Sequence, residues 1–233
     1  MSLTINHHPR HRNLFVLDFP LISHRLTSLR DVESKSSVDY RRKLGEIAEL
    51  MVTPSTIDLR MTTKRIKTPL EEFDAPVLAD QRPIVVPILR AALAMHEPFA
   101  RLLEADIGMI GVYRDHKTCE PHEYMAKLPP LEGRPIFLVD PMLATGGSAI
   151  YAIEYMLNHG ADINDIRFIS LVSVPEGVKA VHSAFPELRI YTAALDSHLN
   201  AVKYIVPGLG DAGDRAFGTE KLAARISSPR PTR

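Results

Sequence analysis

Cysteine is scarce in this chain of 233 residues: Cys119 is the only one, so no disulfide can form within it. No histidines lie at metal-ligand spacing around this cysteine, so it is not expected to bind zinc. It indicates a reducing compartment, and hence the cytoplasm. Excess charge is also absent, because 28 lysines and arginines balance 28 aspartates and glutamates, which argues against nucleic acid or an anionic membrane as partner. No apolar run approaches the roughly 20 residues of a membrane span, and no signal-peptide core follows the basic start, Met1–Arg12. A small molecule is the expected ligand.

The most informative run is Phe137–Ser148, which reads FLVDPMLATGGS. The four apolar residues Ile136–Val139 do not alternate with polar ones, which predicts a parallel strand buried on both faces. Asp140 follows at the carboxyl end of this strand, the edge at which open α/β sheets bind their ligands. Thr145 and Gly146 then begin a turn of small residues. Strand, carboxylate and small-residue turn, in this order, indicate a ribose-phosphate site.

A helix is predicted over 149–159, because Ile150, Ile153 and Leu157 recur at helical spacing and Gly160 can end it. The turn before it lies at a helix N-terminus, where unpaired N–H groups and the helix dipole favour an anion. The lysine of a G-x-x-x-x-G-K-[ST] pattern is missing, which excludes a nucleoside-triphosphate P-loop, and the paired glycines lack dinucleotide spacing. The alternative is an ordinary glycine-rich turn between a strand and a helix.

The chain is expected to form an α/β fold: a single domain with a mainly parallel central sheet flanked by helices, because apolar runs alternate with helix-like stretches. The domain is placed at residues 19–219, between a mobile N-terminal extension, 1–18, and a partly disordered C-terminal tail, 220–233. The irregular, proline-containing stretch Thr53–Ala79 is either an antiparallel excursion or a subunit contact. The predicted strands are Ile84–Leu89, Ile107–Tyr113, Ile136–Val139, Phe168–Val174 and Ile190–Leu195, and the predicted helices include Tyr40–Met51 and Glu176–Phe185.

The run Asp140–Ser148 resembles the phosphoribosyl-pyrophosphate loop of phosphoribosyltransferases. Its sequence is similar to that of this loop in the uracil phosphoribosyltransferase family. Most of that superfamily has two adjacent acidic residues at the strand end, whereas Pro141 follows Asp140 here. The resemblance covers about Pro20 to Thr219 and implies the type I phosphoribosyltransferase fold with a C-terminal uracil-binding hood. Further segments that resemble the family, in family order, are Pro87–Ala91, Tyr113–Asp115, Pro175–Ala180, Tyr191–Asp196 and Tyr204–Arg215.

By this resemblance, the catalytic residues are Asp140, which orients the ribose, and Arg90 and Arg114, which contact phosphoribosyl pyrophosphate. The fixed charge and forked donors of arginine suit a diphosphate, although by position alone each would be an ordinary solvated arginine. Mg²⁺ is expected to arrive with the diphosphate, bound through substrate oxygens and water, so no protein metal ligands are assigned. The residues expected to bind the ribose 5-phosphate are Asp140, Pro141, Met142, Leu143, Ala144, Thr145, Gly146, Gly147 and Ser148.

The segment Tyr204–Arg215 is glycine-rich and is expected to form neither a helix nor a strand. Such a segment can present backbone N–H and C=O groups to a flat base, although an ordinary surface loop has the same composition. Backbone donors aimed at the exocyclic oxygen of uracil would reject cytosine. The residues expected by resemblance to contact uracil are Ile205, Gly210, Asp211 and Ala212, with Asp211 also facing phosphoribosyl pyrophosphate.

The reaction implied by the resemblance is displacement of pyrophosphate from the ribose by N1 of uracil, giving uridine 5′-monophosphate. Positioning and electrostatics carry it, with no covalent nucleophile, so Cys119 is expected to be a bystander. The histidines His7, His8 and His11 are expected to belong to a solvated terminus rather than to a metal site. Two alternatives are a phosphoribosyltransferase-fold protein that binds nucleotides for regulation with little catalysis, and phosphoribosyl transfer to another base.

Three departures from the family pattern stand out. The family usually has Arg-Ala-Gly-Leu-Gly where this chain has Arg90–Ala94, and Phe19 and the pair Val202–Lys203 replace a histidine and a His-Gly pair. A methyl group at Ala92 is expected either to displace the pyrophosphate loop or to strain it, and so to weaken substrate binding. The resemblance also allows for GTP as an effector and for a homo-oligomer, either a dimer or a tetramer.

Overall fold

A computed structural model describes residues 7–8, 11–32, 36–79, 81–114 and 121–219. Cys119 and the predicted tail, 220–233, lie outside these residues. The helices are α1 (Pro20–Arg30), α2 (Ser37–Ser55), α3 (His96–Leu102), α4 (Gly147–Asn158), α5 (Pro175–Ala184) and α6 (Ala212–Phe217), with the 3₁₀ turns η1 (Ala91–Ala94) and η2 (Ile163–Asp165). The strands are β1 (His7–His8), β2 (His11–Val16), β3 (Met61–Lys67), β4 (Glu72–Leu78), β5 (Ile84–Leu89), β6 (Asp106–Ile107), β7 (Met109–Arg114), β8 (Pro121–Lys127), β9 (Ile136–Val139), β10 (Met142–Leu143), β11 (Ile166–Ser173), β12 (Arg189–Leu195), β13 (His198–Leu199) and β14 (Ile205–Val206).

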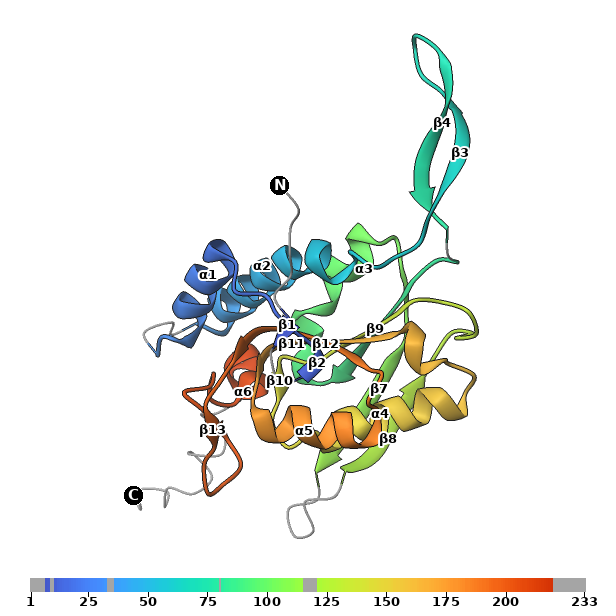
Figure 1. The fold of residues 1–233 in the computed structure, drawn as a ribbon. Coiled ribbons are helices and arrows are strands. Elements are labelled where there is room, and N and C mark those ends of the chain that lie inside the picture. Colours follow the sequence, from blue (N-terminus) through green and yellow to red (C-terminus); the bar gives the residue numbers. More distant parts are fainter. Residues whose placement is uncertain (1–6, 9–10, 33–35, 80, 115–120, 220–233) are drawn as a thin grey trace, which may run out of the picture.

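The central sheet has the strand order β1-β2-β12-β11-β9-β5-β7-β8, with helices on both of its faces (Figure 1). From β2 to β7 every neighbouring pair is parallel, and β1 and β8 add antiparallel edges. The predicted strands at β5 and β9 agree with the structure to the residue. Those at β11 and β12 agree within two residues, and the predicted strand Ile107–Tyr113 is divided at Gly108 into β6 and β7. The predicted α/β architecture is confirmed.

The N-terminal boundary differs from the expected one. Strand β2 pairs in parallel with β12, and the side chains of Leu14 and Leu17 are completely buried. These residues lie within the predicted extension, 1–18, yet from His11 onward the chain is part of the sheet. Burial of two leucine side chains contributes about 3–6 kcal/mol of hydrophobic stabilisation, which explains why this stretch is held on the sheet.

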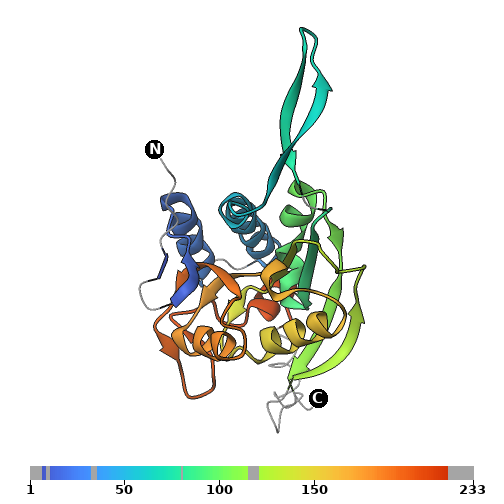
Figure 2. The same ribbon diagram turned by 45° about the vertical axis from the view of Figure 1, so that its right-hand side comes forward.

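Two hydrophobic clusters lie on opposite faces of the sheet. One joins α1, α2, α3 and α6 to side chains such as Phe137 and Ile169, and the other joins α4 and α5 to Leu138 and Phe168. Figure 2 shows the same two layers of helices from another side. In α2, the predicted stripe is completely or almost completely buried: Tyr40, Leu44, Ile47, Ala48 and Met51. In the part of the chain that the structure describes, no helix combines the length and the apolar character needed to cross a membrane.

A two-stranded hairpin, β3–β4, projects from the body of the molecule (Figures 1 and 2). It occupies most of the stretch Thr53–Ala79, so the antiparallel excursion, one of the two alternatives left open for this stretch, is present, although α2 continues through Pro54 to Ser55. All seven residues of β3 are exposed, and so are most of β4. The hairpin therefore receives almost no support from the core of its own chain.

Candidate active site

Three parallel strands bring the predicted catalytic residues to one edge of the sheet. Strand β5 lies between β9 and β7, with Pro87 opposite Val139 and Leu89 opposite Gly111. Arg90 follows β5 and Asp140 follows β9, while Arg114 ends β7. The backbone thus gathers all three at the carboxyl edge, where open α/β sheets bind ligands. The side chains of Arg114 and of the N-terminal histidines lie outside what the structure describes.

Residues 140–148, here called the phosphate loop, connect β9 to α4. Their first part is fixed to the sheet, because the Asp140 N–H donates to the Ile169 carbonyl at 3.0 Å and β10 pairs with β11. Gly146 caps α4 with a left-handed backbone, φ 87°, a conformation that favours glycine. Helix α4 then begins at Gly147, so its first-turn N–H groups, which lack partners within the helix, lie at this turn, an arrangement that suits an anion.

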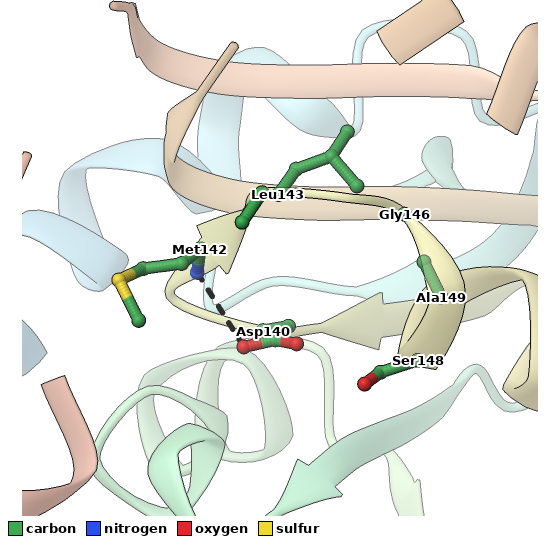
Figure 3. A pocket seen from close by; sticks show the side chains of 7 residues that line it. Asp140, Met142, Leu143, Gly146, Ser148 and Ala149 are labelled. Carbon is green, nitrogen blue, oxygen red and sulfur yellow. Dashed lines mark hydrogen bonds between the residues drawn. The ribbon is translucent and has the colours of Figure 1, made fainter. Parts of the chain in front are cut away.

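A small hollow that is open to solvent lies in this loop. Its lining includes six of the nine predicted loop residues, whereas Pro141, Thr145 and Gly147 do not line it. In Figure 3 the Asp140 carboxylate and the Ser148 hydroxyl lie on the same side of the loop. The Met142 N–H donates to Oδ1 of Asp140 at 3.4 Å, a long hydrogen bond. The residues that line the hollow are Asp140, Met142, Leu143, Ala144, Gly146, Ser148 and Ala149.

Gly177, which the sequence analysis did not single out, supports the phosphate loop from behind. A Cβ at this position would lie 2.3 Å from the Ala144 carbonyl oxygen and 2.8 Å from that of Leu143. Only glycine therefore allows α5 to pack this closely on the loop backbone. A signal existed in the sequence, because this glycine stands two residues after Pro175 in a predicted helix start, where glycine has no advantage for the helix itself.

The turn after β5, which the resemblance makes the pyrophosphate loop, is a 3₁₀ turn, and it bears on one of the two effects expected of Ala92, backbone strain. This residue is completely buried, its methyl group belongs to the hydrophobic core, and its carbonyl accepts from the Met95 N–H at 2.9 Å. Among the described residues other than glycine, positive φ occurs at Glu104 and Lys203 and not at Ala92. The expected backbone strain of the left-handed kind is therefore absent, since a 3₁₀ turn is readily formed by alanine.

The segment Tyr204–Arg215 was expected to form neither a helix nor a strand, and the structure differs from this expectation. It contains β14, and from Ala212 onward it forms α6. The Asp211 carboxylate caps this helix by accepting from the Asp214 N–H at 2.9 Å, and Gly218 ends it with φ 70°. An aspartate cap and a left-handed glycine are strong helix-boundary signals, and together they outweigh the poor helix propensity of glycine within.

The four predicted uracil contacts lie along this segment. Ile205 and Ala212 are buried, whereas Gly210 is exposed with φ 69° and Asp211 is partly exposed. The buried side chains leave backbone groups as the means of recognition, and Ala212 occupies the first helical turn, where N–H groups have no partner within the helix. The prediction of backbone-mediated base binding therefore stays a prediction with compatible geometry.

A buried ion pair holds the same segment to the N-terminal half of the chain. Arg30 donates to both carboxylate oxygens of Asp196, at 2.6 and 2.8 Å, and to the Gly208 carbonyl at 2.8 Å. The Gly208 N–H donates in turn to Asp196 at 2.9 Å. Only 5% of the Asp196 side chain is exposed. This clamp of Arg30, Asp196 and Gly208 escaped the sequence analysis, because no local pattern links residues so far apart.

Hydrogen bonding lowers the pKa of the Glu176 carboxyl, which lies in the first turn of α5. Glu176 accepts from its own backbone N–H and from that of Leu199, and both bonds favour the ionised form. The Leu199 bond, at 3.1 Å, links the start of α5 to β13. Among the residues that the structure describes, no cluster of three or more histidine, cysteine, aspartate or glutamate side chains could hold a metal ion.

An anion loop after β9, an arginine after its neighbour β5 and a mainly parallel sheet together define a type I phosphoribosyltransferase. The same fold occurs in adenine phosphoribosyltransferase from Leishmania donovani, with a TM-score of 0.56 at 16% identity over 82% of this chain and 86% of that one. The chain belongs to the uracil phosphoribosyltransferase family, whose model, described as uracil phosphoribosyltransferase, matches residues 16–219. It is therefore a pentosyltransferase enzyme, as the sequence resemblance predicted.

Individual relatives agree with this assignment. The uracil phosphoribosyltransferase of Rhodospirillum centenum is 51% identical over 214 residues, covering 91% of this chain and 99% of that protein. That of Lacticaseibacillus paracasei is 52% identical over 207 residues, covering 88% and 98%. A solved structure, the AQ2163 protein from Aquifex aeolicus, superposes with a TM-score of 0.82 at 32% identity over 88% and 97% of the two chains. The alternative of a regulatory protein with little catalysis gains no support from these relatives.

Proposed function

We propose that this site transfers the phosphoribosyl group of 5-phosphoribosyl 1-pyrophosphate to N1 of uracil, giving uridine 5′-monophosphate and pyrophosphate. The observation that supports the proposal is that one edge of the sheet gathers a turn at a helix N-terminus, a carboxylate and two arginines, and that α6 contacts the turn after β5. The phosphate loop would hold the 5′-phosphate, and Asp140 would accept hydrogen bonds from the ribose hydroxyls. Arg90 and Arg114 would bind the diphosphate as it leaves.

Mg²⁺ fits this arrangement as an ion that is carried by the substrate. Among the residues that the structure describes, Asp140 is the one carboxylate that lines the hollow, so these residues would offer a single carboxylate donor while the diphosphate and water supply the rest. When bound, Mg²⁺ neutralises part of the diphosphate charge. The balance of charge and the single cysteine of the sequence support the cytoplasm as the place of action.

The test is the formation of uridine monophosphate from uracil and phosphoribosyl pyrophosphate with Mg²⁺, with cytosine as the competing base. We expect a strong preference for uracil, because backbone N–H groups donate to a carbonyl oxygen and not to an amino group. Asp140→Asn should fold normally and lose roughly a hundredfold in kcat, the scale of one well-placed electrostatic contact. No product from the wild type, or a normal kcat in the variant, would refute the proposal or the role of Asp140, respectively.

A homo-oligomer belongs to the same proposal, with the β3–β4 hairpin as its contact. An isolated two-stranded hairpin is at best marginally stable in water, and this one exposes the opposed apolar pairs Met61–Leu78 and Ile66–Phe73. A second copy of the chain would cover them. Light scattering should show a dimer or tetramer for the wild type and a smaller species for Phe73→Lys; an unchanged mass would place the contact elsewhere.

GTP as an effector rests on the family resemblance alone. The same assay tests it when GTP is added at low phosphoribosyl pyrophosphate and saturating uracil. Activation by GTP would support the proposal, and an unchanged rate over the full range of substrate would remove GTP from it.

A further inference from the structure

The guanidinium of Arg90 is held by helix α6 and does not project freely from the pyrophosphate loop. Its Nη2 donates to Oδ1 of Asp214 at 3.3 Å, and its Cζ lies 5.6 Å from the centre of the Phe217 ring. Both partners belong to α6, the helix that Asp211 caps. An ion pair along one edge and an aromatic ring within cation–π distance restrict the orientation of the guanidinium.

The backbones of the two segments also meet. A Cβ on Gly213 would lie 3.8 Å from that of Ala91 and 3.9 Å from Nη2 of Arg90, which is ordinary van der Waals contact. The Asp214 carboxylate is itself held, because its Oδ1 also accepts from the Thr219 hydroxyl. The helix that begins with the proposed uracil contact Ala212, and that Asp211 caps, therefore touches the loop that carries the proposed diphosphate contact.

We infer that Asp214 and Phe217 are positioning residues that fix Arg90 for the diphosphate. They also connect the loop of Arg90 to the segment Tyr204–Arg215, here called the base segment. This inference rests on the proposed function. The guanidinium has five N–H donors, and Asp214 occupies one edge, which leaves the remaining donors for diphosphate oxygens. About half of the Arg90 side chain is exposed (52%), so without these contacts it would have to be ordered when the substrate binds.

The test compares Asp214→Ala and Asp214→Asn with the wild type in two measurements. Steady-state kinetics give KM for each substrate and kcat, and calorimetric titration gives the affinity for phosphoribosyl pyrophosphate with Mg²⁺. Asp214→Ala should weaken binding of phosphoribosyl pyrophosphate on the order of two- to tenfold, the scale of ordering one arginine side chain. Its KM for uracil should change less. Asp214→Asn should recover most of the affinity, because the amide oxygen still accepts from Arg90.

A double-mutant cycle separates positioning from a general structural role. If Asp214 acts through Arg90, Asp214→Ala should have no further effect on phosphoribosyl pyrophosphate affinity in an Arg90→Ala background. Glu97→Ala is the matched control, since it also removes an exposed arginine partner, that of Arg101 at 3.1 Å, and it should leave both substrate affinities unchanged.

Three results with the variants would overturn the inference. Tighter binding in Asp214→Ala would mean that the carboxylate competes with the diphosphate, and fully additive effects in the double mutant would mean that Asp214 acts independently of Arg90. Equal affinity in all variants of an active enzyme would mean that Arg90 needs no positioning. A wild type that binds phosphoribosyl pyrophosphate but makes no uridine monophosphate would refute the proposed function. In that case, the affinities of the variants for phosphoribosyl pyrophosphate would still test the inference. A wild type that binds no phosphoribosyl pyrophosphate would overturn both.

Discussion

Removal of the Asp196 carboxylate should both destabilise the protein and loosen its base segment. In Asp196→Ala the Arg30 guanidinium loses two hydrogen bonds, of 2.6 and 2.8 Å, and the Gly208 N–H loses its acceptor. Loss of one partner of a buried ion pair costs about 3–5 kcal/mol. Because Arg30 keeps its bond to the Gly208 carbonyl and 22% of its side chain is exposed, we expect the lower end, about 3 kcal/mol.

Urea unfolding measures the free-energy change, and a fall in Tm of about 6–12 °C should accompany it in a chain of this length. The KM for uracil should rise, because Gly208 is two residues from Gly210. The control is Asp58→Ala, which removes the partner of the buried Arg167 at the far end of the strands. It should also lower stability, yet it should leave the KM for uracil unchanged. A loss below about 1 kcal/mol in Asp196→Ala, or equal effects of both variants on uracil, would refute this reasoning.

Three further predictions concern the loops and the sheet edge. Gly177→Ala places a methyl group 2.3 Å from a carbonyl oxygen of the phosphate loop and should weaken phosphoribosyl pyrophosphate binding about tenfold. Gly45→Ala is the control, because its methyl group would lie 3.7 Å from the nearest atom, and it should leave binding unchanged. Equal affinities of the two variants in a titration would contradict this prediction. Ala92→Gly should not tighten binding and should lower stability by about 1 kcal/mol, measured by urea unfolding, because a buried methyl group is lost; tighter binding would restore the idea of strain. The hydrogen bond from Arg134 lowers the pKa of Asp106, so this carboxylate stabilises the fold above about pH 4 and the stabilisation is lost as pH falls through the lowered pKa. The stability difference between wild type and Asp106→Asn should shrink in acid, and a difference independent of pH would exclude this ion pair as its source.

The central strands could be predicted from the sequence, because strands buried on both faces leave continuous apolar runs. Strands β5 and β9 have no exposed polar residue and match their predictions to the residue. The opposite holds for β3, whose seven residues are all exposed, so no hydrophobic period reveals it. Strand β2 was missed because its residues, HRNLFV, begin polar and depend on β12 for their place.

The phosphate loop was predictable for a related reason, since its strand, turn and helix follow each other within one short stretch. The supports around it were not. Gly177 matters because α5 packs closely on the loop backbone, and this packing cannot be seen in the local sequence. Asp214 and Arg90, which form an ion pair, are 124 positions apart in the sequence. The expectations of backbone strain at Ala92 and of irregular structure at α6 failed for a common reason. Both assigned a backbone conformation from the residue type alone, whereas a buried 3₁₀ turn and an aspartate cap decided it.

The clamp on the base segment has a consequence for the order of folding. Arg30 and Asp196 are separated by 166 positions, and Arg215 reaches the Asp31 carbonyl across 184. Contacts between such distant residues close long loops and form slowly, whereas β9, the phosphate loop and α4 are neighbours in sequence. We therefore expect a growing or refolding chain to form the turn at residues 140–148 early and the segment Tyr204–Arg215 last, so that, with the proposed roles of these segments, phosphate affinity precedes base recognition.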